Sequence, residues 1–211
     1  MRNGNAMEEL ERYYRFHATI YDATRWLFLF GRKGILKEIR ARLPEGGEIV
    51  EIGCGTGRNL AHLARIFPEA RITGIDLSPE MLAVASRRTA CFGKRVILRR
   101  QIQRGPLETR PDAVLFSYSL SMMNPGWDEV LAAAVDSLGP SGILAAVDFH
   151  DTPARWFRTH MGNHHVCMEA HLLPLLSSLL EPEHLVVRRA YGGLWSYVSF
   201  VGRKAANAPS K

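Results

Sequence analysis

Short apolar runs alternate with amphipathic stretches along the middle of the chain. Between the runs, apolar positions recur at helical spacing over 58–67 and 127–138, and Ser78-Pro79 resembles a capped helix start. Strands that alternate with helices form parallel βαβ units. The pattern therefore predicts an α/β fold with a doubly wound, Rossmann-like sheet. The expected parallel strands are 48–52, 71–75, 96–98, 113–116 and 143–149.

Two further apolar runs lie near the C-terminus. Residues 185–189 and 197–201 flank Gly192-Gly193, a glycine pair typical of a tight turn. We expect these runs to pair as an antiparallel unit that closes the sheet, which brings it to seven strands. Residues 205–211 are expected to be a disordered tail.

The N-terminal segment has a different periodicity. Over residues 8–43 the spacing is helical, with Ile35 and Ile39 on one side and Lys33 and Lys37 on another. Gly31 and Gly34 weaken the middle of this segment, which favours two helices over one. We expect a single domain over 1–211, with a helical lid or docking segment (1–43), a cofactor-binding core (48–150) and an acceptor side (151–204).

Composition places the chain among globular proteins. Of its 211 residues, 46% are hydrophobic and 23% charged, which suits one domain with a large core. The three cysteines are few and scattered, which favours a reducing, cytoplasmic compartment over a disulfide framework. The first residues lack the apolar stretch of a signal peptide, and the longest apolar run there, 26–30, is too short to span a bilayer.

Positive charge is concentrated in the first half of the chain. The net charge is +6, with 20 Lys/Arg against 12 Asp/Glu in residues 1–110 and 7 against 9 in the remainder. Such a surface suits an anionic membrane or nucleic acid, and it also fits a solvated basic face. Charge alone leaves these interpretations open.

A glycine-rich turn after the first strand is the strongest chemical signal. Gly53, Gly55 and Gly57 allow a tight turn and a close approach of a ligand to the backbone. The dinucleotide fingerprint requires a further glycine where Arg58 stands, which disfavours nicotinamide and flavin cofactors. Asp76 ends the second strand, where an acid can accept hydrogen bonds from both ribose hydroxyls.

Together these motifs resemble the class I S-adenosylmethionine-dependent methyltransferases. The resemblance rests on Glu51-x-Gly53-x-Gly55-x-Gly57 and on 74–82, and it spans about residues 48 to 150. It implies that the loop backbone holds the methionine part of S-adenosylmethionine, with Glu51 at its ammonium and Asp76 at the ribose. The resemblance also places Leu77 and Met81 beside the adenine. At the adenine amine, where the family often has an acidic residue, this chain has Gln101 and Ile102. The other residues implied to bind the cofactor are Tyr21, Asn59 and Ser117.

The flanking segments resemble a narrower family, the bacterial N-methyltransferases of betaine-lipid synthesis. The resemblance rests on 13–32, 116–122, 147–151, 162–166 and 191–195. It implies stepwise methylation of the amine of a homoserine-type lipid headgroup. Because the amine must lose a proton, a base is useful, and His150, just past the fifth strand, is the first candidate. Aromatic side chains that could surround the methylated ammonium are Tyr14, Tyr21, Tyr118 and Trp195, and each of them also fits core packing. Among these, Tyr118 is expected to be catalytic. His17 and His165 are expected to bind the acceptor.

Basic and aromatic residues are interspersed over 25–40. Arg25, Lys33 and Lys37 accompany Trp26, Phe28 and Phe30, with Arg32 and Arg40 in the same row. This mixture suits an interfacial helix docked peripherally on the inner membrane face, and it equally suits a lid over the cofactor cleft.

Three alternatives remain beside the aminolipid enzyme. The chain could methylate nitrogen or oxygen of a soluble small molecule, or it could bind the cofactor without catalysis. A nucleic-acid substrate is disfavoured, because 116–119 lacks the Asn/Asp-Pro-Pro-aromatic tetrapeptide common in amino-directed nucleic-acid enzymes. No metal is expected: His160 and His164 have metal-ligand spacing, but methyl transfer needs no metal. The side chains that could suggest a metal, His160, His164, His165, Cys167 and His171, are instead expected to form a histidine wall of the acceptor pocket that contacts a substrate carboxylate.

Overall fold

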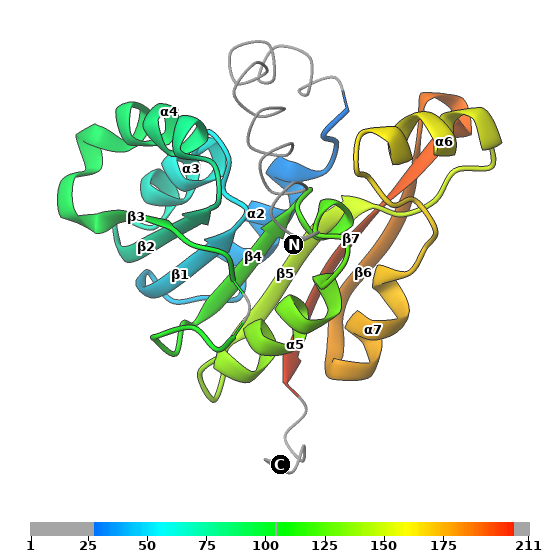
Figure 1. Ribbon diagram of the computed structural model, residues 1–211. Coiled ribbons are helices and arrows are strands. Elements are labelled where there is room, and N and C mark those ends of the chain that lie inside the picture. The colour runs from blue at the N-terminus through cyan, green and yellow to red at the C-terminus, as the bar shows by residue number, and fades with distance from the viewer. Residues whose placement is uncertain (1–27, 104, 205–211) are drawn as a thin grey trace.

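Within the described residues, seven strands form one sheet that carries helices on both faces (Figure 1). The computed structural model describes residues 28–103 and 105–204. The site candidates Tyr14, His17 and Tyr21, the docking candidates Arg25 and Trp26, and the tail 205–211 lie outside these residues. The strands are β1 (Gly46–Ile52), β2 (Glu69–Asp76), β3 (Val96–Arg100), β4 (Ala113–Ser117), β5 (Ile143–Phe149), β6 (Leu180–Ala190) and β7 (Trp195–Lys204).

The strand order is β3-β2-β1-β4-β5-β7-β6. The first five strands in the chain are parallel to their neighbours, whereas β7 is antiparallel to both β5 and β6. This arrangement confirms the predicted doubly wound sheet and its antiparallel closing unit. The chain winds outward from β1 to β3 and then returns to place β4 on the other side of β1. In such sheets ligands bind outside the carboxyl ends of the strands at this reversal.

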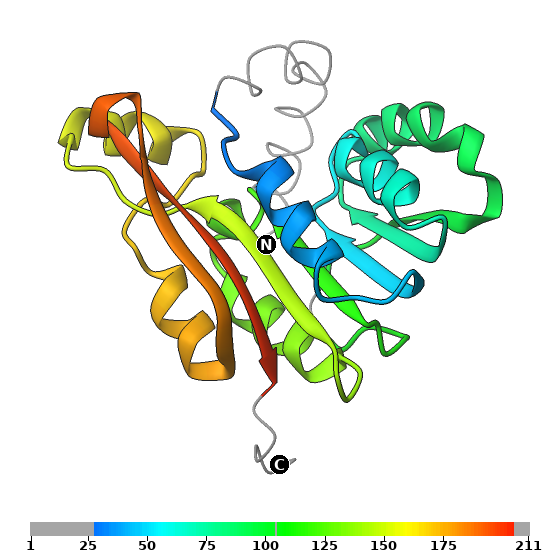
Figure 2. The ribbon, with the colours of Figure 1, turned by 180° about the vertical axis from the view of Figure 1, so that it is seen from behind.

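Alternating residues of the central strands face two separate cores. On β4, Ala113 and Leu115 lie in one core, and Val114 and Phe116 lie in the other. The first core is covered by α2 and α3, the second by α5 and α7, and Figure 2 shows α2 in front of the sheet. The helices are α2 (Arg32–Arg40), α3 (Arg58–Ile66), α4 (Pro79–Thr89), α5 (Trp127–Ser137), α6 (Arg155–Asn163) and α7 (Leu172–Leu179).

Several predicted boundaries differ from the observed ones. Helix α2 begins directly after Gly31, whose φ of 78° ends the preceding segment, but Gly34 lies within the helix. The closing strands are longer than the runs 185–189 and 197–201. Helices α6 and α7 were not predicted, because α7 is apolar nearly all round and α6 is short. No helix in 28–103 or 105–204 is long and apolar enough to cross a membrane.

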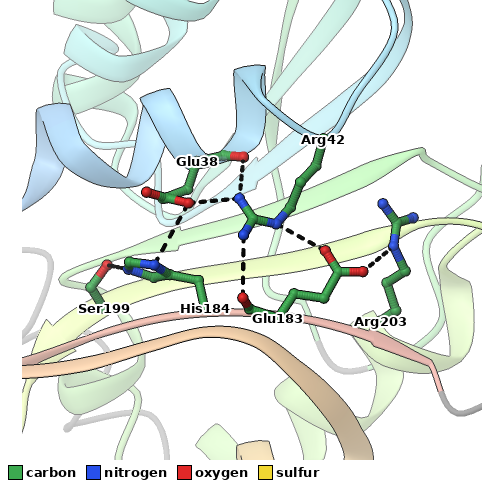
Figure 3. Close-up of polar contacts among 6 residues, drawn as sticks. All are labelled: Glu38, Arg42, Glu183, His184, Ser199 and Arg203. Carbon is green, nitrogen blue, oxygen red and sulfur yellow. Dashed lines mark hydrogen bonds and ion pairs between the residues drawn. The ribbon is translucent and has the colours of Figure 1, made fainter.

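A polar network fastens the end of α2 to the β6–β7 pair (Figure 3). The guanidinium of Arg42 donates to the Glu38 carboxylate at 2.6 Å and to the Glu183 carboxylate at 2.9 Å. Arg203 also pairs with Glu183. On the other side of Glu38, His184 lies 3.6 Å from its carboxylate and 3.1 Å from the Ser199 hydroxyl. These contacts hold α2 against the sheet, so that its first residues reach the carboxyl edge of β1.

Candidate active site

The glycine turn adopts a conformation that only glycine takes without strain. Gly53, Gly55 and Gly57 have φ values of 75°, 52° and 72°. A Cβ on Gly53 would lie 2.4 Å from the Cβ of Ser119, so the turn packs tightly against the loop after β4. At Gly55, by contrast, no atom of the described residues lies within 4 Å of such a Cβ. The turn therefore leaves its backbone open at Gly55, where a ligand can approach it.

Glu51 is buried beside this turn, and the hydrogen bond of its carboxylate involves one of its two oxygens. Its side chain is 1% exposed, and Oε1 accepts a hydrogen bond from the Asn59 amide at 2.6 Å. Asn59 in turn accepts one from Arg32 at 3.0 Å. Oε2 is buried and has no hydrogen-bond partner within 28–103 or 105–204. Burial raises the pKa of Glu51 from its ordinary 4.5 to about 7, against the opposing effects of Asn59 and Arg32.

A buried acceptor without a donor is costly, and a cationic ligand group would correct it. An ammonium at Glu51 Oε2 would supply the missing donor and the opposite charge. The residues present therefore fit the ammonium group that the sequence resemblance assigns to this carboxylate. Arg32, which the sequence placed in a membrane-docking row, instead directs its guanidinium to Asn59 at this site.

Asp76 holds the second cofactor-side loop. Its two carboxylate oxygens accept hydrogen bonds from the backbone N–H of Gly55 at 2.7 Å and of Ser78 at 3.0 Å. The Ser78 hydroxyl caps α4 by accepting from Met81 N–H at 3.1 Å, as the sequence predicts. Asp76 thus links the glycine turn to the start of α4. A carboxylate oxygen can accept more than one hydrogen bond, so Asp76 can also accept from a ligand hydroxyl.

The adenine-side candidates lie around the ends of β2 and β3. Met81 is buried, Leu77 is half-buried and Ile102 is 40% exposed. The Gln101 backbone N–H donates to the Asp76 carbonyl at 3.2 Å, and its side-chain amide donates to Gln103 at 3.2 Å. These contacts bring Gln101 next to Asp76.

The end of β4 supplies Ser117 and Tyr118. Ser117 is buried and its hydroxyl has no hydrogen-bond partner. Tyr118 has a φ of 57°, and its ring is 3% exposed against Phe149, 4.8 Å between ring centroids. The Tyr118 hydroxyl donates to the Phe30 carbonyl at 2.8 Å. Burial raises the pKa of Tyr118 well above its ordinary value, so the phenol keeps its proton.

His150 directly follows β5, and its backbone lies beside the start of β7. Its backbone N–H donates to the Ser196 carbonyl at 2.9 Å, and its Nδ1 is buried with no partner among the described residues. Burial lowers the pKa of His150, against the effect of Asp151, so the imidazole is neutral at pH 7. Trp195 is fully buried between Phe30 and Phe149, with ring centroids 5.8 and 5.0 Å away.

Other histidines lie apart from this group. His165 is exposed, with a φ of 62°, in the connection after α6. The rings of His160 and His164 contact each other at 4.9 Å. Across the described ranges, no three His, Cys, Asp or Glu side chains are grouped so that they could hold a metal ion.

A buried titratable residue near the site, Asp148, was missed by the sequence analysis. Asp148 is fully buried on β5 and accepts hydrogen bonds from the backbone N–H of Phe149 and Ser121, while burial raises its pKa to about 6. An acid within the apolar run 143–149 was a usable signal for it. His171, which the sequence groups with the other histidines of 160–171, precedes α7 and has a buried Nε2 with no partner among the described residues.

The protonation of Glu51 predicts a pH-dependent stability. Between pH 4.5 and 7 the folded chain retains a proton on Glu51 that the unfolded chain releases, so its free energy of unfolding falls as pH rises. Over this range the protein should lose about 3 kcal/mol relative to Glu51→Gln, whose amide does not titrate. Chemical unfolding of both proteins between pH values of about 5 and 8 measures this difference. Asp148 titrates in both proteins, so its contribution cancels in the difference between them. If the free energies of unfolding of the two proteins changed in parallel with pH, the raised pKa of Glu51 would be contradicted.

Residues 49–142 match the family described as a methyltransferase domain. A trans-aconitate 2-methyltransferase of Deinococcus radiodurans is 30% identical over 122 residues, which cover 56% of this chain and 45% of that protein. The chain thus spans about half the length of the curated relatives that it matches.

Solved structures match over most of the chain. The 1,6-didemethyltoxoflavin-N1-methyltransferase of Burkholderia thailandensis, crystallised with S-adenosylhomocysteine, has a TM-score of 0.72 at 19% identity, covering 97% of this chain and 91% of that one. The N-methyltransferase NodS of Bradyrhizobium japonicum, also with S-adenosylhomocysteine, has a TM-score of 0.65 at 19% identity, covering 83% and 87%. The chain therefore has the fold of these solved methyltransferases, and its residues 49–142 are similar to a methyltransferase domain.

Proposed function

We propose that this chain transfers methyl groups from S-adenosylmethionine to the nitrogen of an amine. The observation that carries the proposal is the buried carboxylate of Glu51, whose Oε2 has no donor and lies beside a glycine turn that is open at Gly55. A non-catalytic binding protein would need only this half of the site. The neutral His150 at the neighbouring strand end supports catalysis.

The cofactor is held by residues of two loops in this proposal. Glu51 takes the ammonium, the open backbone at Gly55 takes the rest of the methionine part, and Asp76 takes the ribose hydroxyls. The residues proposed to complete the site are Leu77 and Met81 beside the adenine, Gln101 or Ile102 at its amine, and Asn59 and Ser117 next to the reacting end. Asn59 acts by fixing the Glu51 carboxylate, which it contacts at 2.6 Å.

The chemistry requires a neutral nucleophile. S-adenosylmethionine supplies an electrophilic methyl group on a sulfonium. An aliphatic amine arrives mostly as its ammonium at pH 7, so each methylation releases one proton. His150 has a buried, unpartnered Nδ1 and a lowered pKa, and it can accept that proton from the acceptor nitrogen. The aromatic rings of Tyr118 and Trp195 line the adjoining core and hold the loops around this position.

The acceptor that the sequence resemblance implies is an amine on a homoserine-type lipid headgroup. An apolar rim supports an amphiphilic acceptor, because Phe28, Phe30 and Tyr191 are 37%, 41% and 51% exposed and contact one another. Exposed Lys33 and Lys37 on α2 lie close in sequence to this rim and suit an anionic membrane surface. We therefore propose a cytoplasmic protein that docks peripherally on the inner membrane face.

A soluble acceptor is the second candidate. The curated relatives are named for trans-aconitate, a small carboxylic acid, and their similarity covers the cofactor-binding half of this chain. The site also admits a compact molecule, since the exposed rim of Phe28, Phe30 and Tyr191 is separate from the half-buried His150. Both candidates share the cofactor half of the site and differ only at the acceptor.

Methyl transfer to a panel of acceptors tests the proposal. Short-chain diacylglyceryl-homoserine, homoserine, benzylamine and trans-aconitate would each be supplied with labelled S-adenosylmethionine, and the products weighed by mass spectrometry. We expect the aminolipid to be methylated fastest, in steps. Methylation of soluble amines alone would refute the lipid acceptor, and methylation of trans-aconitate alone would refute amine transfer.

Replacement of His150 by Gln tests its role as the base. The variant should lose roughly a hundredfold in kcat near pH 7, because no group then removes the proton. Activity should recover as pH rises, since the solvent then supplies neutral amine. The wild-type protein should retain its rate to a lower pH than an exposed histidine would allow, because burial lowers the pKa of His150 and keeps the imidazole neutral. A variant with the wild-type rate at every pH would show that the proton leaves by another route.

A further inference from the structure

A second imidazole lies beside His150 in the acceptor half of the site. His171 precedes α7, and the residue before it, Ala170, donates its backbone N–H to the His150 carbonyl at 2.7 Å. The connection is held at a second point, where Cys167 N–H donates to the Ser121 carbonyl at 2.9 Å. Residues from the ends of β4 and β5 therefore fix the backbone around both histidines.

The ring of His171 is held in one orientation. Its Nδ1 lies 3.4 Å from the sulfur of Cys167, and its face contacts the edge of Trp127 with ring centroids 4.7 Å apart. Burial and the neighbouring Glu169 carboxylate raise the pKa of Cys167, so the sulfur is a thiol. With Nδ1 committed to this thiol, Nε2 is the ring atom left for a ligand, and it is buried without a partner.

Nδ1 of His150 and Nε2 of His171 are thus two buried ring nitrogens that have no hydrogen-bond partner among the described residues. Ala170, which precedes His171 and donates to the His150 carbonyl, has a φ of 56°, and Tyr118 at the end of β4 has a φ of 57°. Strained backbone beside unsatisfied polar atoms is typical of binding sites. A ligand with two N–H donors would satisfy both nitrogens.

We propose that His171 binds the acceptor amine together with His150, each imidazole accepting one N–H of the same nitrogen. This inference rests on the proposed amine methylation and names a residue that determines acceptor specificity. In this arrangement Nδ1–H of His171 donates to the Cys167 sulfur, which leaves Nε2 as an acceptor. His150 takes the proton that the amine loses, and His171 orients the nitrogen.

The charges around the pair favour two neutral rings. Asp151 lies beside His150 and Glu169 beside His171, and each carboxylate favours the charged imidazole. Burial outweighs them and lowers both pKa values, and His150 lowers that of His171 further. Arg158 pairs with Asp151 at 3.0 Å and weakens that carboxylate's influence. Neutral rings accept hydrogen bonds from an amine, whereas a carboxylate ligand would need charged donors.

The number of N–H groups on the acceptor makes the inference testable. A primary or secondary ammonium has at least two N–H groups and can engage both histidines. A tertiary ammonium has one, which goes to His150. A contact with His171 therefore matters for the first two methylations and not for the third.

The experiment compares wild type with His171→Asn and His171→Gln on short-chain diacylglyceryl-homoserine and its monomethyl and dimethyl forms. Asparagine at position 171 is a good N-cap for α7 but has no atom at the position of the His171 Nε2. Glutamine at the same position has a longer side chain and restores a polar atom there. We expect kcat/KM of His171→Asn to fall about tenfold on the unmethylated and monomethyl amines and to stay unchanged on the dimethyl amine. His171→Gln should recover most of the loss, and the affinity of both variants for S-adenosylhomocysteine should match wild type.

Two results would overturn the inference about His171 and leave the proposed function standing. One is an equal fall of kcat/KM on all three amines, which indicates a structural role, and the other is no fall on any of them. A wild-type protein that methylates no amine would overturn the proposed function and this inference with it.

Nitrogen NMR of ¹⁵N-histidine-labelled wild-type protein provides a check that needs no variant. Nε2 of His171 should be unprotonated at pH 7 and shift when the aminolipid is added with S-adenosylhomocysteine, and a protonated or unshifted Nε2 would refute the assignment.

Discussion

A carboxylate buried at the end of the central strand is the constraint on which the site depends. Glu51 occupies the position on β1 that faces α2 and α3, because side chains alternate along the strand and Ile49 faces the same core. Burial there raises its pKa to about 7, and the polar groups that reach it come from both helices: Asn59 on α3 directly and Arg32 on α2 through Asn59. The polar network around Arg42 that fixes α2 to β6 and β7 therefore also fixes the position of the helix that reaches this carboxylate.

The strand order divides the site into two halves. Parallel strands β1 and β2 bring the glycine turn and Asp76 together through the bond from Gly55 N–H. On the other side of the reversal, β5 and the antiparallel β7 bring the backbone of His150 next to that of Ser196. The first half contains buried or partly buried carboxylates and suits a cationic, hydroxyl-bearing cofactor. The second half contains neutral imidazoles within an aromatic surround and suits an amine.

The sequence predicts the first half well, because local signals determine it. Three glycines in a seven-residue turn, an acid at a strand end and a Ser-Pro helix start each imply their own geometry, and the structure has all three. Continuous apolar runs likewise predicted the parallel strands, since strands covered on both faces carry apolar residues at every position. The family resemblance supplied the roles that these patterns alone leave open.

The second half depends on contacts between distant residues, which leave no local pattern. The bond from Tyr118 to Phe30 joins residues 88 positions apart, and that from Arg32 to Asn59 joins residues 27 apart. His171 is brought beside His150 by a connection whose helices the periodicity did not reveal. An exposed rim at Phe28 and Phe30 was predicted only as part of a basic and aromatic mixture, and its contact with Tyr191 depends on the β6–β7 turn.

Proton release on cofactor binding tests the central claim that Glu51 receives a cation. Titration calorimetry with S-adenosylhomocysteine, in buffers of different ionisation enthalpy, counts the protons released. With a pKa of about 7 in the free protein, pairing with an ammonium should release close to one proton at about pH 6 and about half a proton at pH 7. Glu51→Gln should release none from this site, and Asp148 provides the same background in both proteins. Tight binding by wild type with no more proton release than the variant would contradict the account.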